Sequence, residues 1–209
     1  MVQHYKFNFL SYFIIFCSGA IATFAIPPFS IFLLSLALGL GVYLITLSPS
    51  LKTAFISGWV FGFGWFSFGL YWIGSAFLVS DTYHKSLMPF AIIILPSILA
   101  SFWGFACVCS KLLTKKNQSS IFLTIVFLCL FEYLRSKLFT GFPWLMPSMI
   151  LSSNEYLIQI FSFIGSFVAN LFVLCFSVLP FILILNFQKK YIVFTFLVIP
   201  ITILLFSSF

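Results

Sequence analysis

Long apolar runs separated by short polar breaks restrict the fold of this chain more than any single motif does. A helix needs about 17 to 25 apolar residues to cross the roughly 30 Å hydrocarbon core of a bilayer. Seven runs are candidates for such helices: Phe9 to Ile26, Ile31 to Leu47, Ala54 to Val79, Leu87 to Ser110, Ser120 to Leu138, Tyr156 to Asn186 and Tyr191 to Phe209. The sequence therefore predicts an all-α polytopic membrane protein with about seven transmembrane helices, forming a single domain over residues 1–209.

Composition agrees with this class, since 63% of the residues are hydrophobic, only 6% are charged and the mean hydropathy is +1.22. The net charge of +7 is spread singly and in pairs between the apolar runs, which favours topology determinants over a nucleic-acid surface. A cytoplasmic N-terminus puts most of the basic residues inside, namely Lys6, Lys52, Lys111, Lys115, Lys116, Lys189 and Lys190. All three acids then lie outside, and so does the C-terminus.

The third apolar run is rich in glycine and aromatic residues. Gly58 and Gly62 form a G-x-x-x-G pattern, and Gly69 follows seven residues later on the same helical face. These glycines predict a helix-packing site where a neighbouring helix approaches closely. The aromatic residues between them are expected either to fill gaps or to line a lipid-binding groove.

The segment FEYLRSKLFTGFPW, Phe131 to Trp144, places charges in an otherwise lipid-like sequence. Glu132 and Arg135 are three residues apart, so their side chains can meet on one helical face. Two interpretations stay open at this point. The pair is a buried strut, or Arg135, together with Lys137, receives an anionic headgroup at the outer interface.

A turn follows this charged helix at Gly141, Phe142, Pro143 and Trp144. Pro143 cannot continue a helix, and Trp144 suits the membrane interface or a position beside an acyl chain. Glu132, Arg135 and the four turn residues are therefore the candidate site residues of the sequence.

No catalytic residue, metal site or cofactor is expected in this chain. Its five cysteines all lie within apolar runs, where a thiol packs as a small hydrophobe. The two histidines fall on opposite sides of the predicted membrane, and Asp81, His84 and Lys85 are read as a short polar loop rather than an acid–base site. No nucleotide-binding loop is present.

Four blocks resemble the N-terminal membrane portion of the bacterial apolipoprotein N-acyltransferase family. They are SGAIATFAIPPFSIF at Ser18 to Phe32, GWVFGFGWFSFGLYWI at Gly58 to Ile73, FEYLRSKLFTGFPW, and LIQIFSFIGSFVANLFV at Leu157 to Val173. The stretch after Trp144 departs from the family, whose members usually continue with a Gly-Tyr-Ser-Gln-like sequence, where this chain has LMPSMILSS.

The resemblance implies a multi-pass protein of the bacterial inner membrane, in which Glu132, Arg135, Gly141, Phe142, Pro143 and Trp144 form the substrate or lipid vestibule. It also implies a nitrilase-like domain outside the membrane, whose Glu, Lys and Cys transfer an acyl chain from phospholipid to the N-terminal diacylglyceryl-cysteine of lipoproteins. That domain is expected to be absent from this chain, so the partners would be membrane phospholipid and a diacylated lipoprotein presented by a missing or separately encoded domain.

Three functional hypotheses follow from these residues. The chain is the membrane part of a truncated or split N-acyltransferase, which is not catalytic alone. Alternatively it is a non-catalytic remnant or a lipid- or partner-binding scaffold. A small transporter is the third reading, which Glu132 and Arg135 support poorly because they lie near one end of their apolar run.

Overall fold

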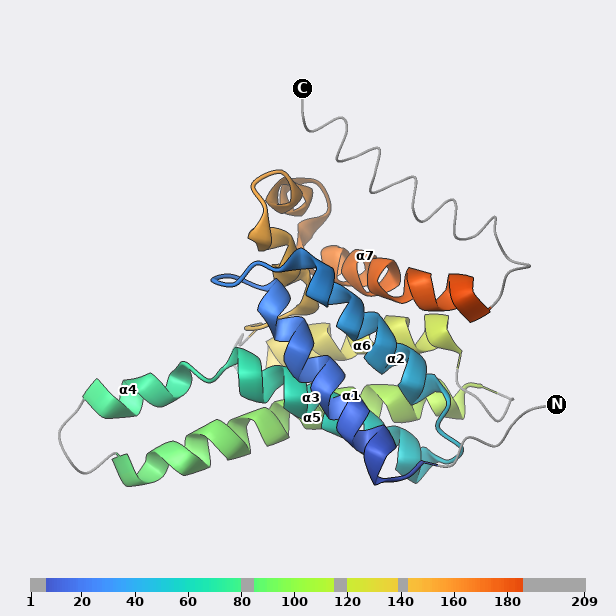
Figure 1. The fold of residues 1–209 in the computed structure, drawn as a ribbon, viewed down its shortest axis with the longest axis horizontal. Helices are drawn as coiled ribbons and strands as arrows, with labels where there is room; N and C mark the ends of the chain where they lie inside the picture. Colours follow the sequence, from blue (N-terminus) through green and yellow to red (C-terminus); the bar gives the residue numbers. More distant parts are fainter. Residues whose placement is uncertain (1–6, 80–84, 115–119, 139–142, 186–209) are drawn as a thin grey trace.

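The computed structural model describes residues 7–79, 85–114, 120–138 and 143–185, and in these ranges the chain is entirely helical apart from turns and loops. Seven α-helices and five 3-10 helices (η) follow one another in the described ranges (Figure 1): α1 Phe9–Ala22, η1 Thr23–Ala25, η2 Phe32–Ser35, α2 Leu36–Thr46, α3 Leu51–Gly69, α4 Ile73–Val79, η3 Lys85–Leu87, α5 Met88–Leu112, α6 Ile121–Leu138, η4 Pro147–Ser153, η5 Leu157–Gln159 and α7 Ile160–Leu185.

Side-chain caps explain where two of these helices begin. The Asn8 side chain accepts a hydrogen bond from the Ser11 amide at 3.0 Å, which starts α1. The Ser50 hydroxyl accepts one from the Thr53 amide at 3.1 Å, so α3 begins at Leu51, earlier than the predicted Ala54. Each cap satisfies a backbone donor that the first helical turn leaves without a partner.

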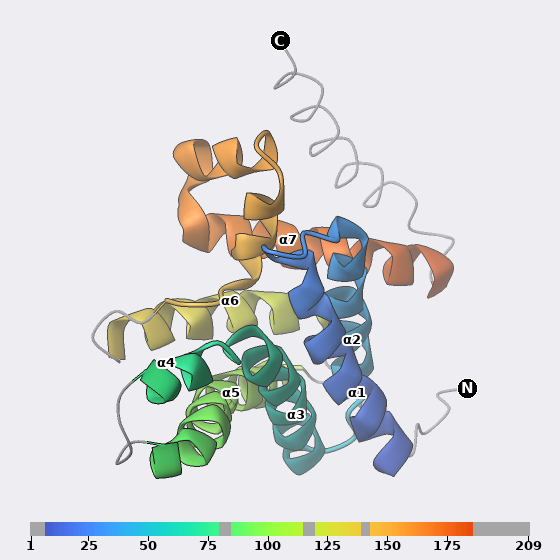
Figure 2. The ribbon, with the colours of Figure 1, turned by 60° about the vertical axis from the view of Figure 1, so that its left-hand side comes forward.

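Helix α3 lies at the centre of the bundle, between α1 on one side and α5 on the other (Figure 2). Its buried residues Phe61, Trp65 and Phe66 pack around Trp103 of α5, with ring centroids 5.0 to 6.2 Å from the indole. Aromatic side chains bury a large area each, so this cluster contributes strongly to the packing of α3 against α5.

The prediction of one helix over 54–79 is wrong, because the chain forms two helices there. α3 ends at Gly69, residues 70–72 form a turn, and α4 continues to Val79. α4 then runs beside the first part of α5, and the two project from the bundle on the left of Figure 1. The turn leaves Tyr71 and Trp72 exposed at the end of α3.

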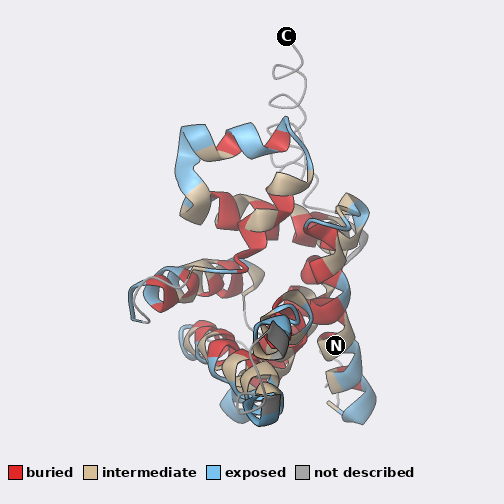
Figure 3. Cartoon of the chain, turned by 90° about the vertical axis from the view of Figure 1, so that its left-hand side faces the viewer, coloured by how far each residue is buried: buried red, intermediate tan, exposed pale blue. Residues whose placement is uncertain are grey.

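The predicted helix from Tyr156 is interrupted as well. η5 precedes α7, and within α7 Gly165 has φ 73° and ψ 166°, a conformation that glycine adopts readily and other residues rarely do. The chain therefore changes direction between Gln159 and Ser166. This part stands out from the bundle at the top of Figure 3, and many of its residues are exposed.

Two segments of the described part are long and apolar enough to cross a membrane, Met88–Leu112 and Leu157–Leu183, with mean hydropathies of 2.2 and 2.3. Phe9–Ala25 and Phe32–Thr46 are apolar but shorter. The predicted run Tyr191 to Phe209 lies outside the described residues, as do Asp81 and His84. The number of spans and the sidedness of the termini stay predictions.

Candidate functional site

A buried ion pair forms the centre of the candidate site. Glu132 and Arg135 lie on the C-terminal half of α6, where their three-residue spacing puts them on the same face. The Arg135 Nη2 donates to Glu132 Oε2 at 2.5 Å, and the two residues are 0% and 1% exposed. Burial at this level means that neither charge is available at the molecular surface.

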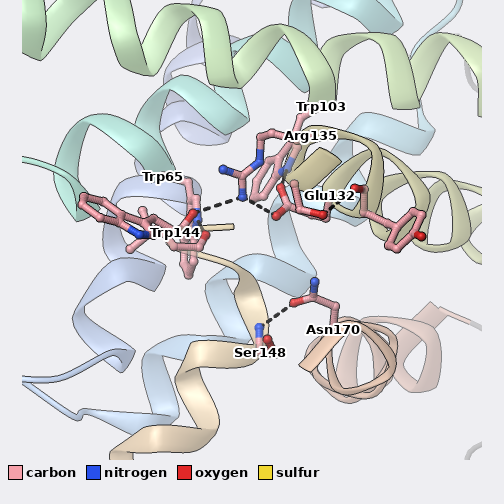
Figure 4. A network of polar contacts seen from close by, with 10 residues as sticks. Trp65, Trp103, Glu132, Arg135, Trp144, Ser148 and Asn170 are labelled. Atoms are coloured by element: carbon pink, nitrogen blue, oxygen red, sulfur yellow. Dashed lines mark hydrogen bonds and ion pairs between the residues drawn. The ribbon is translucent and has the colours of Figure 1, made fainter. Parts of the chain in front are cut away.

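Trp103 provides a further donor to this pair. Its indole Nε1 donates to Glu132 Oε1 at 2.7 Å, so each carboxylate oxygen accepts a hydrogen bond (Figure 4). The Arg135 guanidinium also lies over the Phe66 ring, 5.1 Å from its centroid. Hydrogen bonds and an aromatic face together offset part of the cost of removing the charges from water.

The same network binds the loop that follows α6. Arg135 Nη2 donates to the Trp144 carbonyl at 3.1 Å, and Trp65 Nε1 of α3 donates to the Leu145 carbonyl at 2.8 Å. Leu145 has φ 58°, a conformation that is uncommon for a residue with a side chain. Two consecutive carbonyls of this loop are therefore held by side chains from α6 and α3.

A second anchor holds the loop against α7. The Ser148 amide donates to Asn170 Oδ1 at 2.7 Å, and both residues are fully buried. Figure 4 shows that Arg135 and Asn170 contact the loop at two separate points, near Trp144 and at Ser148. The loop from Trp144 to Ser148 is thus tied to three helices, α3, α6 and α7.

A cavity of about 1000 Å³ lies beside this loop. It is bounded by the end of α1 with η1 and the following loop, by the end of α3 with the turn after it, and by the loop after Pro143. Its lining residues are Thr23, Phe24, Ile26, Pro27, Pro28, Phe29, Ser67, Phe68, Gly69, Leu70, Tyr71, Trp72, Trp144, Leu145 and Met149. Among the described residues, none of the lining side chains carries a charge.

Two half-exposed indoles are part of this lining. The rings of Trp72 and Trp144 lie 5.2 Å apart between centroids, and 45% and 42% of these residues is exposed. Trp72 follows α3 and Trp144 follows α6, so the turn between α3 and α4 is what brings the two together. A large apolar hollow with aromatic residues at its edge has the chemistry to hold hydrocarbon chains.

The predicted vestibule residues are only partly visible. Glu132, Arg135 and Trp144 come together in the network above, and Pro143 directly precedes Trp144. Gly141 and Phe142 lie outside the described residues. Lys137 is exposed, and its Nζ lies 5.4 Å from the Tyr133 ring centroid, away from the buried pair.

The three glycines of α3 that were predicted to pack against a helix face two different neighbours. A Cβ at Gly58 would lie 2.6 Å from both the Trp103 carbonyl and the Cys107 sulfur, and a Cβ at Gly62 would lie 3.0 Å from the Ala100 Cα, all on α5. A Cβ at Gly69 would instead lie 2.1 Å from the Leu145 side chain. Gly69 therefore makes room for the stretch from Trp144 to Ser148, called the cavity loop from here on, and not for a helix.

Comparison with known proteins identifies the family. Residues 18–179 match the apolipoprotein N-acyltransferase N-terminal domain. The chain belongs to this family. It is 36% identical over 137 residues to the apolipoprotein N-acyltransferase of Allorhizobium ampelinum, a match that covers 61% of this chain and 26% of that protein. Its identity to the proteins of Rhizobium etli and Agrobacterium fabrum is 36% and 35%, over 68% and 69% of this chain and 29% and 30% of theirs.

The chain thus matches between a quarter and a third of the length of these N-acyltransferases, and the matched family domain is the N-terminal one. The match contains α6, the cavity loop and both tryptophans of the network. Among the described residues, no three His, Cys, Asp or Glu side chains come together as a metal site would require.

Trp65, Trp103 and Asn170 are site residues that the sequence reasoning missed. One general signal was available, because a carboxylate buried in an apolar helix needs more donors than a single arginine supplies. In helices this apolar, indole N–H groups are among the few candidates. That signal limits the residue type but does not say which tryptophan is the donor.

Proposed function

We propose that this chain forms the membrane part of an apolipoprotein N-acyltransferase and that its large cavity receives an acyl chain of the phospholipid donor. In this proposal the acyl group goes to the N-terminal diacylglyceryl-cysteine of a lipoprotein, in the bacterial inner membrane. The supporting observations are the family membership and the uncharged cavity of about 1000 Å³.

The cavity loop carries the proposal most directly. Arg135 and Trp65 hold the carbonyls of Trp144 and Leu145, and both loop residues line the cavity. A wall tied in this way keeps its shape whether or not a lipid is bound, which lowers the ordering cost of binding. Arg135 acts here as a positioning residue, since its guanidinium is buried against Glu132 and does not reach the cavity surface.

The proposed reaction assigns the bond-making groups to a nitrilase-like domain. Its cysteine sulfur attacks the ester carbonyl of the phospholipid, forms a thioester and releases a lysophospholipid. The α-amino nitrogen of the lipoprotein then attacks the thioester, forms an amide and releases the thiol. We propose that the present chain supplies the lipid side of this site and that the domain is supplied on the same or a second polypeptide.

Complementation tests this function. The chain is expressed with a nitrilase-like domain of a relative in cells depleted of their own enzyme, and the N-terminal lipopeptide of a lipoprotein is analysed by mass spectrometry. We expect triacylated lipopeptide with the native chain. Met149→Trp, which narrows the cavity, should reduce it by about tenfold or more.

Leu130→Trp is the matched control, because Leu130 lies on α6 with 52% exposure and does not line the cavity. It should leave triacylation unchanged. If the native chain never restores triacylation with any partner domain although both are present in the membrane, the proposal is wrong and a non-catalytic scaffold becomes the better interpretation.

A further inference from the structure

A second, smaller cavity of about 330 Å³ lies on the other side of η4. At two places, one residue lines the large cavity and the next residue in the chain lines the small one. Phe29 and Met149 line the large cavity, whereas Ser30 and Ile150, which directly follow them, line the small one. The loop after α1 and the 3-10 helix η4 therefore form a shared partition between two hollows.

The small cavity is lined mainly by apolar side chains, with the buried Ser35 hydroxyl inside and uncharged polar residues at its edge. Ile150, Ile160 and Val173 are at most 4% exposed and contribute its interior, whereas Ser153 is half-buried and Asn154 is exposed. Its lining contains no charged side chain among the described residues. These walls do not suit a phosphate or a metal ion, which need charged or strongly polar ligands.

The volume of the small cavity is large enough for part of a hydrocarbon chain. A volume of about 330 Å³ equals that of roughly eleven molecules of liquid water at about 30 Å³ each. Eight of the twelve lining residues are apolar, so water would find polar partners only at Ser30, Ser35, Ser153 and Asn154, and an occupant that is mainly hydrocarbon is favoured. The uncharged polar residues at the edge can contact an ester group at the end of such a chain.

We propose that the small cavity binds one acyl chain of a membrane diacyl phospholipid whose other chain occupies the large cavity. Two neighbouring apolar hollows with one partition between them fit a molecule with two chains joined at one end. The occupancy of the large cavity rests on the proposed function above. The small cavity makes an additional claim, that the second chain is held by the protein instead of remaining in the bilayer.

Photo-crosslinking tests this inference. The full chain is reconstituted in vesicles of phosphatidylethanolamine and phosphatidylglycerol, in which the phosphatidylethanolamine carries a diazirine near the end of one acyl chain. After irradiation, modified peptides are mapped by mass spectrometry. We expect modification within 150–153 and 172–176, the stretches that contain six of the residues lining the small cavity. Val173→Phe should reduce it by roughly tenfold, equivalent to about 1.4 kcal/mol.

Val168→Phe is the control on the same helix, because Val168 is 54% exposed and does not line the cavity. It should leave the crosslinks unchanged. Ile160→Phe is a second filling variant, used if Val173→Phe does not give a monodisperse protein. Equal crosslinking of the native chain and the filling variants, or an equal effect of Val168→Phe, would overturn the inference.

The two proposals fail separately. If Met149→Trp abolishes triacylation while neither filling variant changes the crosslinks at 150–153, the large cavity keeps its function and the small cavity holds no chain. If the crosslinks at 150–153 depend on Val173 but triacylation is never restored, lipid binding by the small cavity holds without the acyltransferase function.

Discussion

At the scale of single residues, the buried pair Glu132 and Arg135 is the part of the site most sensitive to the loss of one partner. Glu132→Ala leaves the Arg135 charge buried without its carboxylate, and it removes the acceptor of Trp103. Breaking one partner of a buried pair typically costs about 3–5 kcal/mol. We therefore expect a large loss in the free energy of unfolding, measured by thermal or denaturant unfolding of the purified protein in detergent.

A double substitution distinguishes two contributions to the free energy of unfolding: the cost of burying one unpaired charge, and the stabilisation that the intact pair provides. Replacing Glu132 and Arg135 together by methionine removes both charges and keeps most of the volume. Such replacements are often close to neutral, so the double variant should be more stable than Glu132→Ala. A double variant as unstable as the single one would show that the pair itself, including the bond to the Trp144 carbonyl, is essential to the fold.

Trp65→Phe tests whether the cavity loop is held from α3. The substitution removes the bond to the Leu145 carbonyl and keeps most of the aromatic packing. We expect a loss of about 0.5–1.5 kcal/mol in the free energy of unfolding and faster hydrogen exchange of the amides within 146–150, where all residues except Pro147 carry an N–H. Trp59→Phe is the control, since its indole donates to the Ser97 carbonyl and lies outside this network. Equal exchange at 146–150 in both variants would contradict the assigned role.

The same residues indicate how far sequence reasoning reaches at this scale. The contact between Glu132 and Arg135 follows from helical spacing alone, and it was expected as one of two alternatives. Their other partners come from α3, α5 and the loop after α6, so they depend on tertiary packing that no local pattern specifies. The sequence alone leaves open whether Arg135 binds a lipid headgroup. Its burial in the structure weighs against direct contact between its guanidinium and a headgroup.

At the scale of elements, the packing of α3 against α5 depends on glycine. Gly58→Ala would bring a Cβ within 2.6 Å of the Trp103 carbonyl, which is backbone and cannot rotate away. Overpacking of this kind costs about 1–3 kcal/mol, and we expect a corresponding drop in the unfolding midpoint. Gly74→Ala is the matched control, because its Cβ would meet the flexible end of Met88 at 3.0 Å. Since Gly→Ala by itself favours a helix, an equal loss in both variants would contradict the packing argument.

Helix boundaries are also only partly predictable from the sequence. Apolar runs locate most of the helices, because a continuous apolar segment between turn residues favours a buried or membrane helix. The end of α3 at Gly69 was missed, since the following Leu70, Tyr71 and Trp72 are as apolar as the helix itself. What favours the turn is tertiary: Leu145 fills the space beside Gly69, and Trp72 meets Trp144.

At the scale of the whole molecule, the C-terminal ends of α1 and α3 and the loop after α6 meet at the large cavity. Successive long helices that run in opposite directions bring the C-terminal ends of α1, α3 and α6 to the same side. The charge pattern predicts that this side is the outer one. The cavity would then open where a lipoprotein and a nitrilase-like domain could reach it. This is the arrangement that the proposed function requires.

Cysteine labelling tests that sidedness. In a variant whose five cysteines are replaced, Asn154→Cys and Pro49→Cys each introduce one exposed thiol in a loop. Asn154 follows η4 beside the cavities, whereas Pro49 precedes α3 at its opposite end. With the predicted topology, a membrane-impermeant maleimide labels Asn154→Cys in intact spheroplasts and labels Pro49→Cys only after permeabilisation. The reverse pattern would place the cavity on the cytoplasmic side, where secreted lipoproteins could not reach it, and would contradict both the charge argument and the proposed function.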